Sequence, residues 1–180
     1  MEPFIEQFLI PILAGTMIIF IAGATWILFL INQQAKKKSV LIVDDAEHVL
    51  KQLGEFLEKG NYIVHQADSR EKAGGIITNE KLDYAIIDLW LKGDKSPEGV
   101  YIFQFLLEKK PEVKPIMLSG VSNIEEAMEE FKKYLEGTPE EIDKMLQKVK
   151  DNFISKGDPK KNYLLAIQEK LGVFQEKIQF

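Results

Sequence analysis

The sequence contains no cysteine, and this absence limits the chemistry that the protein can perform. It excludes disulfides, thiol nucleophiles and thiolate metal sites, and it is compatible with a cytoplasmic domain. Positive charge is also scarce, because 23 Lys and Arg face 28 Asp and Glu and leave a net charge of −5. An acidic balance argues against nucleic acid as a partner, because the phosphate backbone is bound through Lys and Arg.

One long stretch lacks charge of either sign. Residues 8–31 form 24 uncharged residues, which as a helix rising about 1.5 Å per residue would cross a hydrocarbon core of about 30 Å. Three lysines at 36–38 follow the stretch and two glutamates precede it. The positive-inside rule then predicts a single-pass membrane anchor with its C-terminal side in the cytoplasm. A buried core helix or an uncleaved secretion signal is the alternative interpretation.

The sequence is therefore expected to divide into five parts. These are a short extracytoplasmic N-terminus at 1–7, a transmembrane helix at 8–31, a basic tether at 32–38, a folded domain at 39–172 and a C-terminal tail at 173–180. Setting residues 1–38 aside removes two acids and three lysines, so the remainder carries 20 Lys and Arg against 26 Asp and Glu, a net charge of −6.

Two apolar stretches of the folded domain end in carboxylates. They are VLIVDD at 40–45 and YAIIDLW at 84–90. A carboxylate is costly to bury, so each acid should emerge where a buried strand ends. Asp44, Asp45 and Asp88 are then expected to meet at one edge of a parallel sheet. Carboxylates that meet repel one another, and a divalent cation relieves the repulsion.

Strand-like and helix-like segments alternate through the domain. Strands are predicted at 40–43, 62–64, 84–87, 116–118 and 153–154, with amphipathic helices between them. Thr138 opens a capping box, which predicts an extra helix at 140–149 between the fourth and fifth strands. A last helix is expected to begin at Asp158 or Pro159. The alternation predicts an α/β fold, a doubly wound five-stranded parallel sheet that binds ligands at the carboxyl ends of its strands.

Two further polar residues follow predicted strands. Ser119 ends the fourth strand, and Lys156 follows the fifth. Alone, each is an ordinary turn or surface residue. Beside three acids, a hydroxyl and an ammonium group form a set that can hold Mg²⁺ together with a phosphoryl group.

These motifs resemble the receiver domain of two-component response regulators, over residues 39–171. VLIVDD, YAIIDLW, IMLSG and FISKG match the acid pair, the phospho-accepting Asp, the Ser/Thr and the Lys of that family. The resemblance implies a flavodoxin-like receiver fold with strand order 2-1-3-4-5. It implies that Asp88 is the phosphoacceptor, and that Ser119 and Lys156 contact the phosphate.

The resemblance also assigns a metal and a switch. It implies Mg²⁺ held by Asp44, Asp45, Asp88 and the backbone carbonyl of Trp90. Phe153, three residues before the lysine, falls where the family carries its switch aromatic, which acts together with Ser119.

The implied function is signalling rather than enzymatic turnover. A histidine kinase or a phosphotransfer protein would phosphorylate Asp88, and slow autodephosphorylation would follow. Too few residues follow 171 for an output domain, so an unidentified downstream protein is the expected target. With the anchor at 8–31, the resemblance places the protein in a bacterial inner (plasma) membrane with its receiver domain in the cytoplasm.

Three departures from the family leave other interpretations open. Gly157 stands where proline is usual, and the segments 88–99 and 119–156 are longer than usual. A receiver-like docking module that works without phosphorylation is the main alternative. A haloacid-dehalogenase-like phosphatase requires an acid where Trp90 stands, and Asp44 and Asp45 would repel the phosphate of a flavodoxin's flavin.

Overall fold

The computed structural model describes residues 21, 23–26, 37–91, 97–121, 123–157 and 162–172, in two units divided between residues 36 and 37. In the first unit, residues 21 and 23–26 are helical. Most of the predicted membrane segment 8–31, and all of the tail 173–180, lie outside the described residues. Within the described part of the chain, no helix has both the length and the apolar character needed to cross a membrane.

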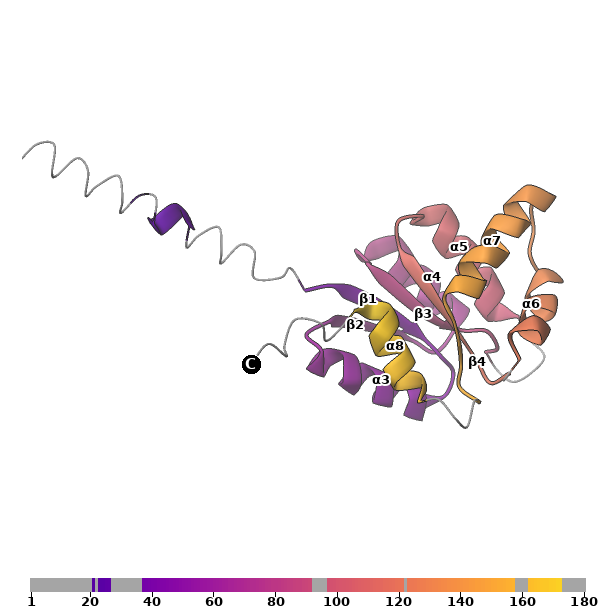
Figure 1. Cartoon of the computed structure of the whole chain (residues 1–180), viewed down its shortest axis with the longest axis horizontal. Helices are drawn as coiled ribbons and strands as arrows, with labels where there is room; N and C mark the ends of the chain where they lie inside the picture. Colours follow the sequence, from indigo (N-terminus) through magenta and orange to yellow (C-terminus); the bar gives the residue numbers. More distant parts are fainter. Residues whose placement is uncertain are drawn as a thin grey trace, which may run out of the picture. The chain divides into compact units, whose positions relative to one another are not determined.

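The second unit is built on five parallel strands (Figure 1). They are β1 Ser39–Val43, β2 Ile63–Ala67, β3 Tyr84–Asp88, β4 Lys114–Ser119 and β5 Phe153–Ser155. Their order is β2-β1-β3-β4-β5, which confirms the predicted parallel sheet and its 2-1-3-4-5 order. Every residue of β1 and β3 is buried, as expected for central strands that are covered on both faces.

The second strand differs from its prediction at 62–64. It spans Ile63–Ala67 because it pairs with all five residues of β1, from Ser39 opposite Ile63 to Val43 opposite Ala67. As an edge strand with only one neighbour, β2 accommodates His65 and Gln66, which local hydrophobicity does not mark as strand residues.

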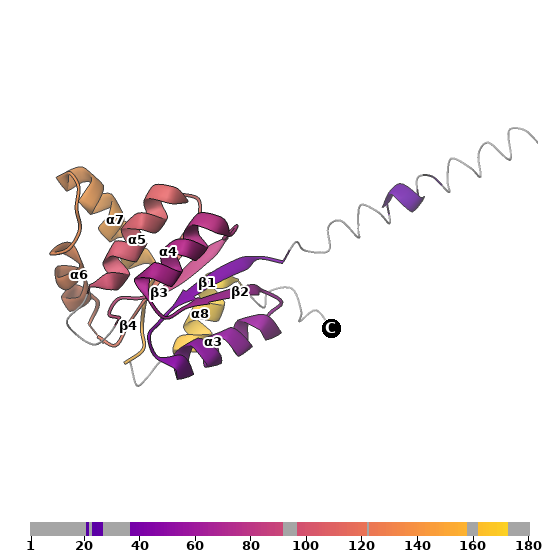
Figure 2. The ribbon, with the colours of Figure 1, turned by 180° about the vertical axis from the view of Figure 1, so that it is seen from behind.

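Helices cover both faces of the sheet. On one face lie α3 (Glu47–Lys59) and α8 (Tyr163–Leu171), which pack on Val40 and Ile42 of β1. On the other lie α4 (Arg70–Asn79), α5 (Glu98–Lys109), α6 (Ile124–Lys132) and α7 (Pro139–Asp151), whose core includes Leu41 and Val43. Alternate residues of β1 thus serve the two cores. Figure 2 shows α4 and α5 lying in front of the sheet.

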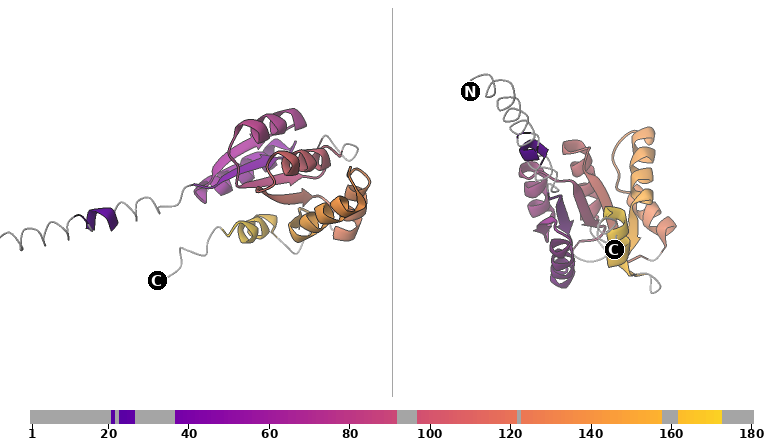
Figure 3. Two further views of the ribbon diagram at one scale, coloured as in Figure 1. Left: turned by 90° about the horizontal axis from the view of Figure 1, so that it is seen from above. Right: turned by 60° about the vertical axis from the view of Figure 1, so that its left-hand side comes forward.

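Two helices, α6 and α7, fill the long connection between β4 and β5 (Figure 3). The predicted capping box is present, because Thr138 Oγ1 accepts from Glu141 N while a Glu141 carboxylate oxygen accepts from Thr138 N. The helix predicted at 140–149 is present as α7, which packs on β4 with Val149 buried. The other helix of the connection, α6, lies beside the carboxyl edge of the sheet.

The last helix begins later than predicted. Asp158 and Pro159 lie outside the described residues, and α8 starts at Tyr163. Asn162 is its N-cap, and the Asn162 side chain accepts a hydrogen bond from Leu164 N at 2.9 Å. An amide side chain at this position satisfies one of the free N–H groups of the first turn, which sets the start of the helix.

The first turn of α5 packs directly against the end of β3. A Cβ atom added at Gly99 would lie 2.0 Å from the carbonyl oxygen of Asp88 and 2.7 Å from that of Leu89. No side chain fits at these distances, so Gly99 is required for the contact between α5 and the segment that carries Asp88.

Replacing Gly99 with alanine is therefore expected to lower the free energy of unfolding by about 1–3 kcal/mol, the usual cost of overpacking a close contact. The matched control is Gly75→Ala in α4, where an added Cβ meets nothing within 4 Å. The control should be neutral or stabilising by up to about 1 kcal/mol, because alanine favours the helix. Urea denaturation of both variants measures this, and equal stabilities would contradict the close packing at Gly99.

Candidate functional site

Four polar side chains meet at the carboxyl edge of the sheet. Asp88 ends β3 and Ser119 ends β4, while Asp44 follows β1 and Lys156 follows β5. The parallel arrangement brings the four strand ends together, although 112 residues separate Asp44 from Lys156. Local sequence positions each residue on its own strand, and the strand order makes them neighbours.

The three predicted acids form one cluster. One carboxylate oxygen from each of Asp44, Asp45 and Asp88 lies within 4.8 Å of the others. Asp44 and Asp88 are buried, while Asp45 is exposed to solvent. Ala46 N donates to Asp44 Oδ1 at 3.0 Å and holds that carboxylate in place. An all-oxygen donor set with one open, solvated side suits a hard divalent cation such as Mg²⁺.

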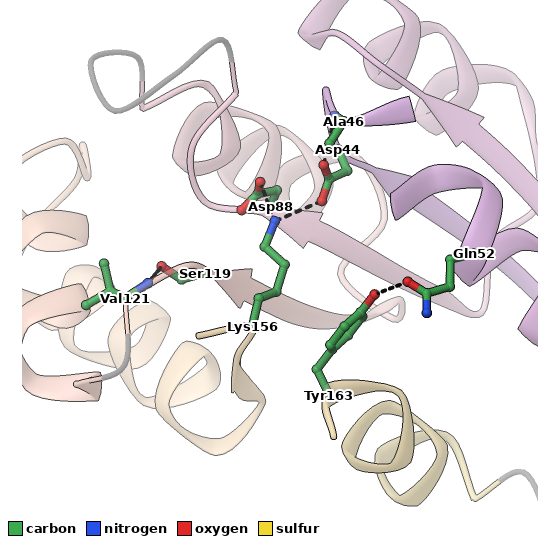
Figure 4. Close-up of polar contacts among 8 residues, drawn as sticks. All are labelled: Asp44, Ala46, Gln52, Asp88, Ser119, Val121, Lys156 and Tyr163. Atoms are coloured by element: carbon green, nitrogen blue, oxygen red, sulfur yellow. Dashed lines mark hydrogen bonds and ion pairs between the residues drawn. The ribbon is translucent and has the colours of Figure 1, made fainter. Parts of the chain in front are cut away.

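Lys156 joins two of these acids. Its Nζ donates to Asp88 Oδ2 at 2.7 Å and to Asp44 Oδ2 at 2.9 Å (Figure 4). Its backbone N donates to the carbonyl oxygen of Ser119 at 2.7 Å, which anchors the segment after β5 to the end of β4. The ammonium group therefore sits directly beside the carboxylate that was predicted to be the phosphoacceptor.

The electrostatics of Asp88 follow from its surroundings. Its pKa is raised from the ordinary value of 3.8 to about 6, chiefly by burial and also by the negative charge of Asp44. The Lys156 ammonium and the backbone N–H of Trp90 work in the opposite direction. Burial also opposes the charge on Lys156, but the carboxylates of Asp88 and Asp44 outweigh this and raise the pKa of the lysine. The cluster thus holds more negative charge than one lysine can balance.

The remaining predicted residues lie around this cluster. Ser119 is fully buried, and its Oγ accepts a hydrogen bond from Val121 N at 3.1 Å. Phe153 is half-buried and packs against the core under α7. Trp90 is half-buried, and its ring meets Tyr134 edge to face with the ring centroids 6.4 Å apart.

Gly157 has a structural reason for departing from the family pattern. A Cβ atom there would lie 2.4 Å from the carbonyl oxygen of Gly120, so the segments that follow β4 and β5 touch at this point. Gly157 N also donates to Ser155 Oγ at 3.1 Å, a hydrogen bond that proline has no N–H to make. Glycine therefore allows these two segments to close around Ser119 and Lys156.

The cluster opens into a pocket of about 660 Å³ that is lined in part by residues the sequence did not point to. The lining residues are Asp45, Asp88, Trp90, Gly120, Val121, Glu126, Glu130 and Lys156. Sequence reasoning missed the two glutamates of α6. Their spacing beside the buried Ala127 and Phe131 marks them as one helix face, but no local signal says that this face borders the site.

A second feature that the sequence did not reveal is a contact between α3 and α8, which lie on the same face of the sheet. Tyr163 OH donates to Gln52 Oε1 at 2.7 Å and links α8 to α3 (Figure 4). Partial burial raises the pKa of Tyr163, and the charges of Lys156 and Asp44 act on it in opposite directions. The tyrosine therefore lies within electrostatic reach of the site.

The raised pKa of Asp88 predicts a pH-dependent cost of folding. A carboxyl group with a higher pKa in the folded state stabilises the protein at low pH, and this contribution is lost as the pH rises from about 4 through 6. At pH 7.5 the ionised Asp88 should cost about 3 kcal/mol, because each tenfold change in proton affinity corresponds to about 1.4 kcal/mol. Asp88→Asn removes this cost, so without metal it should be the more stable protein.

Urea denaturation in EDTA at pH 5 and pH 7.5 measures this difference. The advantage of Asp88→Asn over wild type should be about half as large at pH 5, because pH 5 lies only about halfway between the ordinary pKa of 3.8 and the raised pKa of about 6. Asp68→Asn, at an exposed carboxylate after β2, is the control and should show no such gain. A destabilised Asp88→Asn protein at pH 7.5 would contradict the electrostatic account.

Comparison with known proteins agrees with this geometry. A model of the response regulator receiver domain matches residues 40–156. The photosynthetic apparatus regulatory protein RegA of Cereibacter sphaeroides is 28% identical over 99 residues, which are 55% of this chain and 52% of RegA. The nitrogen assimilation regulatory protein NtrX of Azorhizobium caulinodans is 29% identical over 94 residues, 52% of this chain and 20% of NtrX. The chain thus spans about half the length of RegA.

Solved structures show the same fold. A CheY-like response regulator receiver domain protein from Methanospirillum hungatei JF-1 superposes with a TM-score of 0.55 and 26% identity, covering 76% of this chain and 95% of that chain. The family match includes all four strand-end residues, from Asp44 to Lys156, and extends over more than half of the 180 residues. The chain therefore belongs to the response regulator receiver domain family.

Proposed function

We propose that this chain is a signalling receiver in which Asp88 accepts a phosphoryl group from a histidine kinase or a phosphotransfer protein. Receiver domains interact with proteins of these two kinds. The observation that carries the proposal is the contact between Lys156 Nζ and Asp88 Oδ2, at 2.7 Å, within a cluster of three acids. A nucleophilic carboxylate, a cation for the transferred phosphate and a set of metal ligands then share one pocket.

The cofactor of the proposed reaction is Mg²⁺. Receiver domains bind Mg²⁺ through an Asp cluster, and here Asp44, Asp45 and Asp88 provide the oxygens. We include the backbone carbonyl of Trp90 as a further ligand, because Trp90 lines the same pocket. The bound cation would supply positive charge for the oxygens of the transferring phosphoryl group.

The phosphoryl transfer itself requires an ionised Asp88. With a pKa of about 6, Asp88 is mostly ionised at pH 7 and above. A carboxylate oxygen of Asp88 attacks the phosphorus atom in line, and a phosphorus–oxygen bond forms. The phosphorus–nitrogen bond of the donor phosphohistidine breaks, and its electron pair stays with the imidazole nitrogen. Lys156 then moves its hydrogen bond from the carboxylate to a phosphate oxygen, so its charge stays paired.

The proposed output begins at Ser119 and Phe153. Phosphorylation adds a charge of about −1.5 to −2. The hydroxyl of Ser119 would turn from its contact with Val121 N and donate to the phosphate. The backbone hydrogen bond from Lys156 N to Ser119 O would tie this movement to β5, where the half-buried Phe153 would repack. An unidentified downstream protein would read the changed face.

The proposed location is the inner membrane of a bacterium. The 24 uncharged residues at 8–31 and the three lysines that follow them support an anchor with the receiver on the cytoplasmic side. Anchoring would confine the search for a membrane-bound kinase to two dimensions.

Asp88→Asn should abolish phosphorylation, because an amide is not a nucleophile for this reaction. Wild type with Mg²⁺ and acetyl phosphate should gain the mass of one phosphoryl group, measured by intact mass spectrometry. The control variant Asp68→Asn should behave like wild type, since its exposed carboxylate lies outside the pocket. Phosphate on Asp88→Asn would refute the assignment, and no phosphate on wild type would favour the docking module.

Mg²⁺ binding should weaken in acid, because the proton on Asp88 competes with the metal. With a pKa of about 6, the apparent dissociation constant should be about tenfold higher at pH 5 than at pH 8. Titration of Trp90 fluorescence in a Trp26→Phe background measures the affinity. Asp88→Asn should bind more weakly and with little dependence on pH, and an equally steep pH dependence in this variant would assign the competing proton elsewhere.

A further inference from the structure

We propose that Glu126 and Glu130 of α6 form an acidic rim on the phosphoacceptor pocket that selects against small anionic phosphodonors. The inference rests on the proposed role of Asp88 as phosphoacceptor. It concerns which donors reach Asp88, whereas the proposed function concerns the reaction that follows.

The position of α6 is held by contacts at both of its ends. Asn123 caps the helix, and its Oδ1 accepts from Glu125 N at 2.9 Å. Ala127 and Phe131 are fully buried, and the ring of Phe131 meets Phe103 of α5 edge to face at 5.3 Å between centroids. These contacts fix the rotation of the helix about its axis, so the residues on each of its faces are determined.

The face beside the buried one carries the acidic rim. Glu126 and Glu130 are one turn apart, and both line the pocket into which Asp88 opens. Among the described residues that line this pocket, Lys156 is the single cation, against the carboxylates of Asp45, Asp88 and the rim. Lys156 already donates hydrogen bonds to Asp88 and Asp44, so its charge is largely balanced by these two carboxylates.

Neighbouring charge offsets the rim only in part. Lys133 forms an ion pair with Glu130, but its side chain is 59% exposed, where solvent weakens such a pair. The two charges of Mg²⁺ would balance the Asp cluster below and leave Glu126 with no counter-charge from the metal. Of the charges on the described lining residues, a donor entering the pocket would therefore meet the negative ones of Glu126 and Glu130 and one positive one, Lys156, to which a bound metal would add.

The rim should act on free anions more than on phosphohistidine. Charges at the mouth of a pocket change the rate at which charged ligands arrive, within a screening length of about 8–10 Å. Acetyl phosphate is a dianion at neutral pH and brings no compensating contacts. A phosphohistidine arrives on a protein that docks through a much larger surface. Repulsion from the acidic rim is then a smaller part of the total interaction free energy of the two proteins. Glu126 and Glu130 would thus reserve Asp88 for protein donors.

The test compares two double variants of the full-length chain at saturating Mg²⁺. Glu126→Gln with Glu130→Gln removes the rim charge. Glu125→Gln with Glu129→Gln removes the same charge from an exposed face of the same helix that does not line the pocket. The rim variant should be phosphorylated by acetyl phosphate about threefold to tenfold faster than wild type at low salt. The gain should shrink at high salt and be smaller with phosphoramidate, which carries less negative charge.

The control variant should stay close to wild type under every condition, and circular dichroism establishes that all variants fold. Equal rates for the rim variant and its control, or a gain that salt does not reduce, would overturn the acidic rim while leaving Asp88 as phosphoacceptor. If no variant, wild type included, incorporates phosphate, the proposed function fails and this inference fails with it.

Discussion

The structure depends on placing two buried carboxylates beside one ammonium group at the edge of a parallel sheet. Asp44 and Asp88 have side chains that are 1% and 8% exposed, and each would be costly alone in a low-dielectric environment. Lys156 contacts both, yet burial still holds the pKa of Asp88 well above its usual value. The site is therefore left with an excess of negative charge, which is the condition under which a divalent cation binds favourably.

The surrounding fold maintains this arrangement through close backbone contacts. Gly99 lets the first turn of α5 touch the carbonyl of Asp88, and Gly157 lets the segment after β5 touch Gly120 after β4. The hydrogen bond from Lys156 N to Ser119 O joins the same two segments. These contacts connect the end of β3 to α5, and the end of β4 to the segment after β5, through backbone atoms in close contact.

The connection between β4 and β5 contains two helices, and both bear on the site or on the strand that leads to it. The helix α7 packs on β4, while α6 borders the pocket and brings two glutamates to it. Trp90 lies two residues after Asp88 of β3, and its ring meets that of Tyr134, in the turn after α6, edge to face. This connection thus reaches the site in two ways, through the charge of the glutamates and through an aromatic contact.

The sequence pattern by itself predicted the five-stranded parallel sheet, and the resemblance to receiver domains supplied its strand order. Together they named Asp44, Asp45, Asp88, Ser119 and Lys156, which the structure places at one edge of the sheet. The sequence pattern succeeded because buried central strands are uniformly apolar, so a carboxylate at the end of such a run stands out. The edge strand β2 and the start of α8 were misplaced, because pairing with β1 and capping by Asn162 decide them. Only the tertiary structure revealed that α6, rather than α7, borders the site and that Glu126 and Glu130 line it. The helical period shows which residues share a face, but the packing of Phe131 against Phe103 decides what that face meets.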